Sequence, residues 1–240
     1  SINLKRSAIS GGDAGNSWIG YGIEKASSWT SCPTVVIDDC IVQGGNISAG
    51  CSGGGFGNAM NIVNDVGDLL SKLTITNSCF VANKNAYNGG TAIRLNGGDD
   101  NARANELAKE QSLAAVQGVM IVGAPTTART IELPQSVSLT EDFTLPANVT
   151  LAIPAGKTLT VPSGKTLKVA NGAALQVYGT VQNEGIVDNE GTIRNINCIV
   201  GNGAVINNGV VEGSPVVVTK ANGTIIAYDD ESYAAALVAA

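Results

Sequence analysis

Acidic residues that are adjacent in the chain are the first candidates for chemistry. Asp38 is followed by Asp39, and Asp99 is followed by Asp100. A glycoside hydrolase needs two carboxyl groups on either side of a groove, and a calcium-dependent polysaccharide lyase needs metal-binding acids beside an Arg or Lys base. Arg94 is the only base on a predicted strand near the second pair. Arg94, Asp99 and Asp100 therefore form the candidate enzymatic site.

A structural interpretation competes with catalysis at both acidic pairs. Asp38 occupies the same position of a sequence repeat as Asn77, which favours a turn, and Asp99-Asp100 precedes a predicted helix that it can cap. The chain contains no histidine, which excludes His-based acid–base and nucleophilic mechanisms. We therefore expect a non-catalytic protein that needs no cofactor and no metal.

Composition limits the partners and the fold. Among 240 residues there are 14 basic and 20 acidic ones, a net charge of −6, and neither nucleic acid nor an anionic membrane fits so few clustered cations. No apolar run is long enough to cross a bilayer, so this segment is not expected to insert in a membrane. Thirty glycines with 44% hydrophobic and 4% aromatic residues indicate short strands and tight turns.

Five cysteines are spaced too irregularly for a disulfide scaffold or a zinc site. We expect most of them to be small buried hydrophobic residues, with one disulfide among the first four as the alternative. They are Cys32, Cys40, Cys51, Cys79 and Cys198.

A long repeat occupies the N-terminal part of the chain. The segments "RSAISGG" (6–12), "DCIVQGG" (39–45) and "SCFVANK" (78–84) align so that Ser7, Cys40 and Cys79 coincide. Each is followed by a second strand, in "GYGI" (20–23), "GNAM" (57–60) and "GTAI" (90–93), after a connection of variable length. Strands of constant length joined by variable loops are typical of a solenoid.

A shorter repeat occupies the C-terminal part. Residues 179–214 divide into six hexapeptides, with Val or Ile at the third position and Asn or Gly at the fifth in every copy. We expect the third residue to point inward, the fifth to turn the chain with left-handed backbone angles, and polar fourth residues to face solvent. Three strand units of 6–8 residues would form one coil of about 18–24 residues, the size of a β-helix turn.

These patterns predict an all-β fold, a right-handed parallel β-helix of two stacked or tandem modules with short capping helices. The first module covers residues 1–98, and a helical cap or linker covers 99–118. A second solenoid covers 119–228, and the start of a helix that leads to a further module covers 229–240. We interpret the chain as a fragment of a larger protein.

The first module also resembles a known family. "FVAN" (80–83) followed by "GGTAI" (89–93) is similar to the paired FxxN and GGAI motifs of the polymorphic outer-membrane proteins, and the likeness extends over residues 6–95. The first two copies depart from both motifs. The resemblance implies a bacterial surface or adhesin-like β-helix protein, located outside the cell, and it implies no catalytic residue.

Function is predicted from the fold and the irregular loops. We expect a structural or adhesive segment that presents loops to a glycan or a surface protein, with contacts from Trp18, Tyr21, Trp29 and Phe56. The first alternative is a carbohydrate-active enzyme, a polysaccharide lyase or glycoside hydrolase. The second is a filament subunit that associates end to end with copies of itself.

Overall fold

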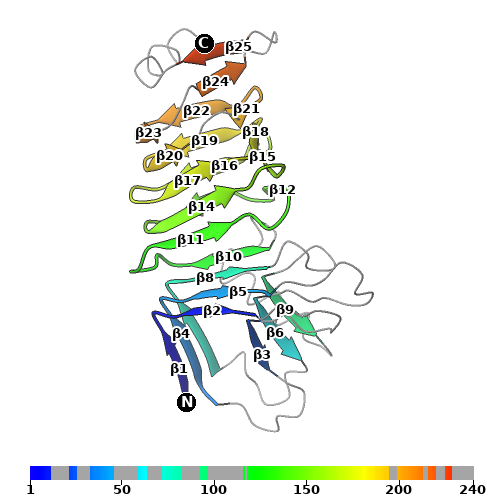
Figure 1. The fold of residues 1–240 in the computed structure, drawn as a ribbon, viewed down its shortest axis with the longest axis vertical. Coiled ribbons are helices and arrows are strands. Elements are labelled where there is room, and N and C mark those ends of the chain that lie inside the picture. Colours follow the sequence, from blue (N-terminus) through cyan, green and yellow to red (C-terminus); the bar gives the residue numbers. More distant parts are fainter. Residues whose placement is uncertain are drawn as a thin grey trace. The chain divides into compact units, whose positions relative to one another are not determined.

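The computed structural model describes the larger part of the chain and divides it into two compact units, Ser1–Arg129 and Thr130–Ala240. The described residues are 1–11, 22–25, 33–45, 59–63, 72–82, 92–96, 116, 118–194, 199–212, 216–219 and 225–228. The predicted helices within 99–118 and 229–240 lie outside them, apart from Val116 and Gly118. Both units consist of stacked strands, which confirms the prediction of an all-β solenoid (Figure 1).

Three parallel sheets form the first unit (Figure 1). One contains β1 (Ile2–Lys5), β4 (Val35–Asp38) and β7 (Leu73–Thr76). The next contains β2 (Ala8–Ser10), β5 (Ile41–Gln43) and β8 (Ser78–Val81). The third contains β3 (Ile23–Lys25), β6 (Met60–Val63) and β9 (Ile93–Asn96). Each turn of the chain thus contributes one strand to each sheet.

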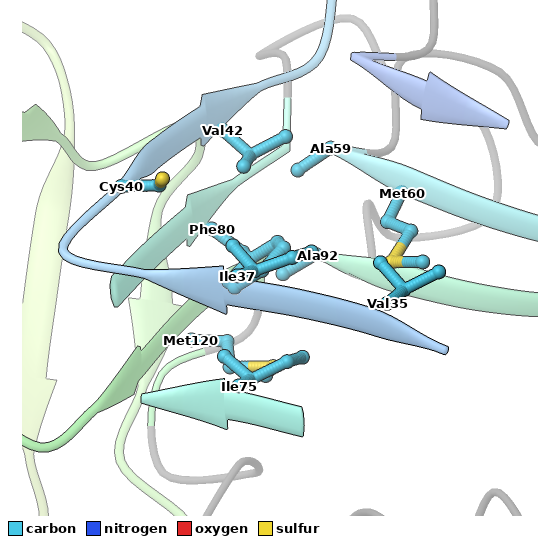
Figure 2. Packing of buried hydrophobic residues seen from close by; sticks show 10 residues of the cluster. All are labelled: Val35, Ile37, Cys40, Val42, Ala59, Met60, Ile75, Phe80, Ala92 and Met120. Carbon is cyan, nitrogen blue, oxygen red and sulfur yellow. The ribbon is translucent and has the colours of Figure 1, made fainter. Parts of the chain in front are cut away.

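The core of this unit lies between the three sheets (Figure 2). Ile37 and Val35 enter it from β4, Val42 from β5, Phe80 from β8 and Met60 from β6. Equivalent inward residues stack on one another, because Leu4 pairs with Ile37 and Ile37 with Ile75. Burying each such side chain contributes about 1.5–3 kcal/mol, which makes this stacking the main stabilising force.

The corner between the first two sheets corrects the sequence alignment by one residue. Cys40 is level with Ser78, not Cys79, because Ile41 pairs with Cys79 in the β5–β8 ladder. Asn77 is therefore level with Asp39, not with Asp38, and both have positive φ, 54° for Asp39 and 49° for Asn77. The turn role that the sequence suggested for Asp38 belongs to Asp39, since strand register aligns backbone positions and not residue types.

An antiparallel strand covers one edge of the first unit. β10 (Val119–Val122), predicted to begin the second solenoid, instead pairs antiparallel with β8 of the first unit. Met120 from β10 is buried in the same core as Phe80 (Figure 2). β10 forms hydrogen bonds with the backbone groups at the outer edge of β8, and without it these groups would be free to pair with another chain.

The second unit repeats the three-sheet design over about four turns. The first sheet contains β11 (Arg129–Glu132), β14 (Val149–Ile153), β17 (Ala174–Val177), β20 (Thr192–Arg194) and β23 (Val210–Glu212). The second contains β12 (Val137–Ser138), β15 (Thr158–Val161), β18 (Thr180–Asn183) and β21 (Ile199–Val200). The third contains β13 (Phe143–Leu145), β16 (Thr166–Val169), β19 (Ile186–Asn189) and β22 (Ala204–Asn207). β24 (Val216–Thr219) and β25 (Ile225–Tyr228) follow as an antiparallel pair.

Turn length in this unit falls from 24 to 18 residues, as the sequence spacing predicted. Thr150 pairs with Ala174, 24 residues later, whereas Thr192 pairs with Val210, 18 residues later. The third hexapeptide residues point inward as expected, and Val181, Val187 and Ile193 are fully buried.

At the fifth hexapeptide position, Gly201 has the predicted positive φ of 118°, but the buried asparagines work differently from the prediction. Asn183 and Asn189 are buried, lie within strands and do not have positive φ. Asn183 Nδ2 donates to the carbonyl oxygen of Ala204 at 3.0 Å, and Asn183 Oδ1 accepts the Gly185 N–H at 3.1 Å. Gly185 at the first position lies against the carbonyl oxygens of the preceding turn, where a Cβ would overlap them. The asparagine side chains thus hydrogen-bond the backbone at the corner, and the lack of a Cβ at Gly185 allows adjacent turns to lie close together.

Replacing Asn183 tests this corner. Asn183→Ala should lower the free energy of unfolding by about 1–3 kcal/mol, because the Gly185 N–H then stays buried without its acceptor. Asn208→Ala, at an exposed side chain on the last turn, is the control and should change stability by less than about 0.5 kcal/mol. Urea denaturation of both variants measures the difference, and equal stabilities would show that the asparagine side chain does not hold the corner.

Candidate functional site

The residues predicted to contact a ligand lie mainly in parts that the structure does not describe. Trp18, Tyr21, Trp29 and Phe56 are outside the described residues, and so are Asp99 and Asp100. Arg94 lies in β9 with its backbone opposite Asn61 of β6, and its side chain is outside the description. The ligand loops and the candidate enzymatic site both remain predictions.

The structure does fix where the variable connections begin and end. Ser10, Gln43 and Val81 are level in the β2–β5–β8 sheet, and the connections 11–22, 44–59 and 82–92 start directly after them. The connections end level with each other too, because Ile23 pairs with Met60 and Met60 with Ile93. Three connections of different length and sequence therefore start and end at one corner of the unit.

This corner is tightly packed. A Cβ on Gly22 would lie 2.8 Å from the carbonyl oxygens of Gln43 and Ala59 and from a methyl group of Val42. Only glycine fits there, so the end of the first connection rests against both ends of the second.

Asp39 forms the strongest polar cluster in the described part of the first unit. Its side chain is buried, and its carboxylate accepts four hydrogen bonds from two successive threonines. The Thr126 hydroxyl donates at 2.5 Å and its N–H at 2.9 Å; the Thr127 hydroxyl donates at 2.8 Å and its N–H at 3.1 Å. Arg129 donates through Nη2 to the Asp39 carbonyl oxygen, with the same nitrogen 4.0 Å from the carboxylate.

These contacts stabilise the charged form of Asp39. The hydrogen bond from the Thr126 hydroxyl, helped by those from Thr127, lowers the pKa of Asp39 from 3.8 to about 2, although burial alone would raise it. Each of the two carboxylate oxygens of Asp39 accepts two of these hydrogen bonds. A perturbed carboxyl group often marks a catalytic site, but here the perturbation comes from bonds that hold the chain after β10 to the Asp39 corner.

Sequence reasoning found Asp39 only as a neighbour of Asp38 and missed its partners. Thr126, Thr127 and Arg129 are 87–90 residues away in the chain, and the two threonines belong to no repeat. No sequence signal identified them. The only hint in the sequence was that Asp39 follows Asp38, the residue that the repeat alignment matched with Asn77 and assigned to a turn.

The described cysteines are structural. Cys40 and Cys79 are free and buried, as expected for small apolar residues. Cys40 Sγ donates to the Asp38 carbonyl oxygen at 3.3 Å, just as the hydroxyl groups of Ser7 and Ser78 donate to the carbonyl two residues earlier. Burial raises the pKa of the Cys79 thiol from 9.0 to about 12.

Charged residues on the outside of the second unit pair between turns. Lys168 Nζ lies 2.7 Å from Glu190 and 3.6 Å from Asp188, and Arg194 Nε lies 2.7 Å from Glu212. The hydrogen bond that Lys168 donates to the Glu190 carboxylate raises the pKa of Lys168. These pairs are at least partly exposed, so each contributes little to stability.

Neither a metal site nor a membrane span emerges from the described residues. In them, no group of three His, Cys, Asp or Glu side chains could hold a metal ion, and no helix has the length and apolarity needed to cross a membrane. Comparison with protein-family models, with curated proteins and with solved structures gives no match in any of the three.

Protonation of Asp39 should weaken the first unit at low pH. Because the folded pKa of about 2 is below 3.8, the carboxylate contributes its full stabilisation above about pH 4 and loses it as the pH falls toward 2. Asp39→Asn should therefore unfold at a lower temperature than the wild type at pH 7, with a difference that shrinks toward pH 2. Calorimetry between pH 2 and 7 measures it, with the exposed Glu141→Gln as control. A difference independent of pH would contradict the assignment.

Cys79 should be protected from alkylation in the folded protein. A pKa near 12 in place of 9.0 lowers the thiolate population at neutral pH about a thousandfold, and burial blocks access as well. Mass spectrometry after iodoacetamide treatment should find Cys79 unmodified in the native chain and modified in urea. Rapid native labelling would show that β8 opens readily.

Proposed function

We propose that the protein is a non-catalytic, secreted or cell-surface β-solenoid that presents loops to a glycan or protein partner. The observation that carries the proposal is the corner where the connections 11–22, 44–59 and 82–92 begin and end on strands in strict register. A regular frame with variable insertions at one corner is how solenoids accommodate recognition.

The frame tolerates changes in these connections at little cost. Loop-closure entropy grows only slowly with loop length, so sequence and length can vary while the ladders stay intact. Gly22 packs against Val42, Gln43 and Ala59, which lie at the ends of the strands, so this packing does not depend on the residues within the connections. Selection for a partner can therefore act on the connections alone.

The composition of the connections supports a glycan as partner. Trp18 and Tyr21 lie in the first connection and Phe56 in the second, while Trp29 lies in the connection from β3 to β4. Aromatic faces provide large apolar contact with sugar rings and cost little conformational entropy. The likeness of residues 6–95 to bacterial surface proteins supports a location outside the cell.

The described titratable groups fit a structural role. Asp39 and Cys79, the two buried groups with large pKa shifts, owe them to hydrogen bonds that hold a corner and to burial in the core. The protein fold thus accounts for both shifts without a substrate.

Substitution of the aromatic residues tests the proposal. Trp18→Ala combined with Phe56→Ala should weaken binding to a glycan array, or to intact cells, about tenfold or more, since each aromatic side chain that contacts a sugar ring contributes roughly 1 kcal/mol or more. The matched control replaces residues 64–71, a connection without aromatic residues, by glycine and serine. Binding that survives the aromatic substitutions but is lost in the control would contradict the proposal.

Catalysis would contradict it as well. A panel of polysaccharides, incubated with and without calcium, should show no cleavage. Cleavage that disappears in Arg94→Ala would instead establish the candidate enzymatic site.

A further inference from the structure

Three tight turns of the second unit share one backbone conformation but differ in the residue before their glycine. The glycines are Gly156, Gly164 and Gly172, with φ angles of 76°, 77° and 79°. In each turn the residue after the glycine donates its N–H to the carbonyl oxygen two residues before the glycine, at 3.0, 3.0 and 2.9 Å. The residues that precede the glycines are Ala155, Ser163 and Asn171. Alanine and serine form this turn as well as asparagine does, so the turn itself does not explain the asparagine.

The side chain of Asn171 and the peptide nitrogen that follows it are both accessible to solvent. Asn171 is exposed, and its side chain has no hydrogen bond with any residue that the structure describes. Within the same described part, no group accepts a hydrogen bond from the Gly172 N–H. Gly172 is exposed as well, and a Cβ on it would contact only Ala147, at 3.4 Å. No side chain of residue 172 therefore keeps the Gly172 nitrogen away from the Asn171 amide.

We propose that Asn171 is a modification site, at which the protein loses the side-chain amide without an enzyme. The Gly172 nitrogen attacks Cγ of Asn171, and the bond from Cγ to Nδ2 breaks. Solvent water carries the proton of the Gly172 nitrogen to the departing ammonia. The resulting cyclic imide consumes one water molecule when it opens. Opening at Cγ gives aspartate, and opening at the backbone carbonyl carbon gives isoaspartate, in which the main chain runs through Cγ.

A second Asn–Gly pair in the described residues is protected by a hydrogen bond. Gly203 follows Asn202, and its N–H donates to the carbonyl oxygen of Asn183 in the preceding turn at 2.9 Å. This bond must break before the Gly203 nitrogen can attack the Asn202 side chain, so the reaction requires a local opening of the turn. Asn202 therefore provides a comparison within the same chain.

The third Asn–Gly pair in the described residues is held by packing. The Asn208 N–H donates to the carbonyl oxygen of Asn189 at 2.7 Å, and a Cβ on Gly209 would overlap the carbonyl oxygen of Gly191. The peptide groups that must rotate to form the imide thus lie against the preceding turn. Among these three pairs, Asn171 is the one whose neighbouring nitrogen is neither hydrogen-bonded nor closely packed.

Both products alter a corner that the preceding turn holds in place. The Ala170 N–H donates to the Leu145 carbonyl oxygen at 3.1 Å, and the Asn148 N–H donates to the Gly172 carbonyl oxygen at 2.9 Å. Isoaspartate adds a carbon atom to the main chain between these two hydrogen bonds, which displaces at least one of them from its favourable geometry. Aspartate adds a negative charge at the same place. The modification therefore weakens the second unit, and this inference is independent of the function proposed above.

Ageing of the full chain in mildly alkaline buffer tests the proposal. Peptide mapping by mass spectrometry should find aspartate and isoaspartate at Asn171 forming about tenfold faster than at Asn202, because the Gly203 hydrogen bond must open first. In guanidinium chloride, where the turns are unfolded, the two asparagines should react at similar rates. Equal rates in the folded chain, or a faster reaction at Asn202, would overturn the proposal.

A serine variant connects the modification to stability. Asn171→Ser is the matched substitution, because Ser163 already precedes Gly164 in an equivalent turn. The fresh variant should melt at the same temperature as the fresh wild type and keep that temperature on ageing, whereas the aged wild type should melt at a lower one. Asn202→Ser, the control, should age like the wild type. Equal losses of stability in the aged wild type and the aged Asn171→Ser variant would contradict the assignment to Asn171.

Discussion

The stacking of each inward side chain on its equivalent one turn away is the constraint on which the rest of the structure depends. Leu151, Leu175 and Ile193 form such a column, and all three are fully buried. A shift of one residue in any strand would turn its apolar side chains to solvent and its polar ones inward. Register is therefore fixed by the core, and every corner and outward row takes its place from that register.

Corners show how polar groups are accommodated within this constraint. Chain direction must change three times per turn, and each change leaves backbone N–H and carbonyl groups near the core. Asn183 and Asn189 supply side-chain amides there, and Asn189 Nδ2 donates to Asn207 Oδ1 at 2.7 Å, which continues the ladder to the next turn. In the first unit Asp39 occupies a corner in the same way. Its buried carboxylate requires hydrogen-bond donors, and Thr126 and Thr127 supply them.

The sequence predicted the parts of the fold that repeat. Val181, Val187 and Ile193 recur at fixed spacing because each fills the same inward position, so fold class and turn length could be predicted. Alignment by residue type failed where chemistry and register disagree, as when Cys79 matched Cys40 although Ser78 lies beside it. The Asp39 cluster could not be predicted at all, because hydrogen bonds to Thr126 and Thr127 join segments 87 and 88 residues apart and leave no periodic signal.

Inward, corner and outward positions differ in how strongly the fold restricts their residue types. Inward positions are mostly apolar, and corner positions include aspartate, asparagine and glycine, although Arg6 occupies the corner level with Asp39 and also has a positive φ. Outward positions are less restricted, although Lys168 and Arg194 pair with acids in adjacent turns. The connections between β2 and β3, β5 and β6, and β8 and β9 differ in length and sequence from one turn to the next. A solenoid built in this way can change these connections without altering its core, and it can alter its core only by changing every turn together.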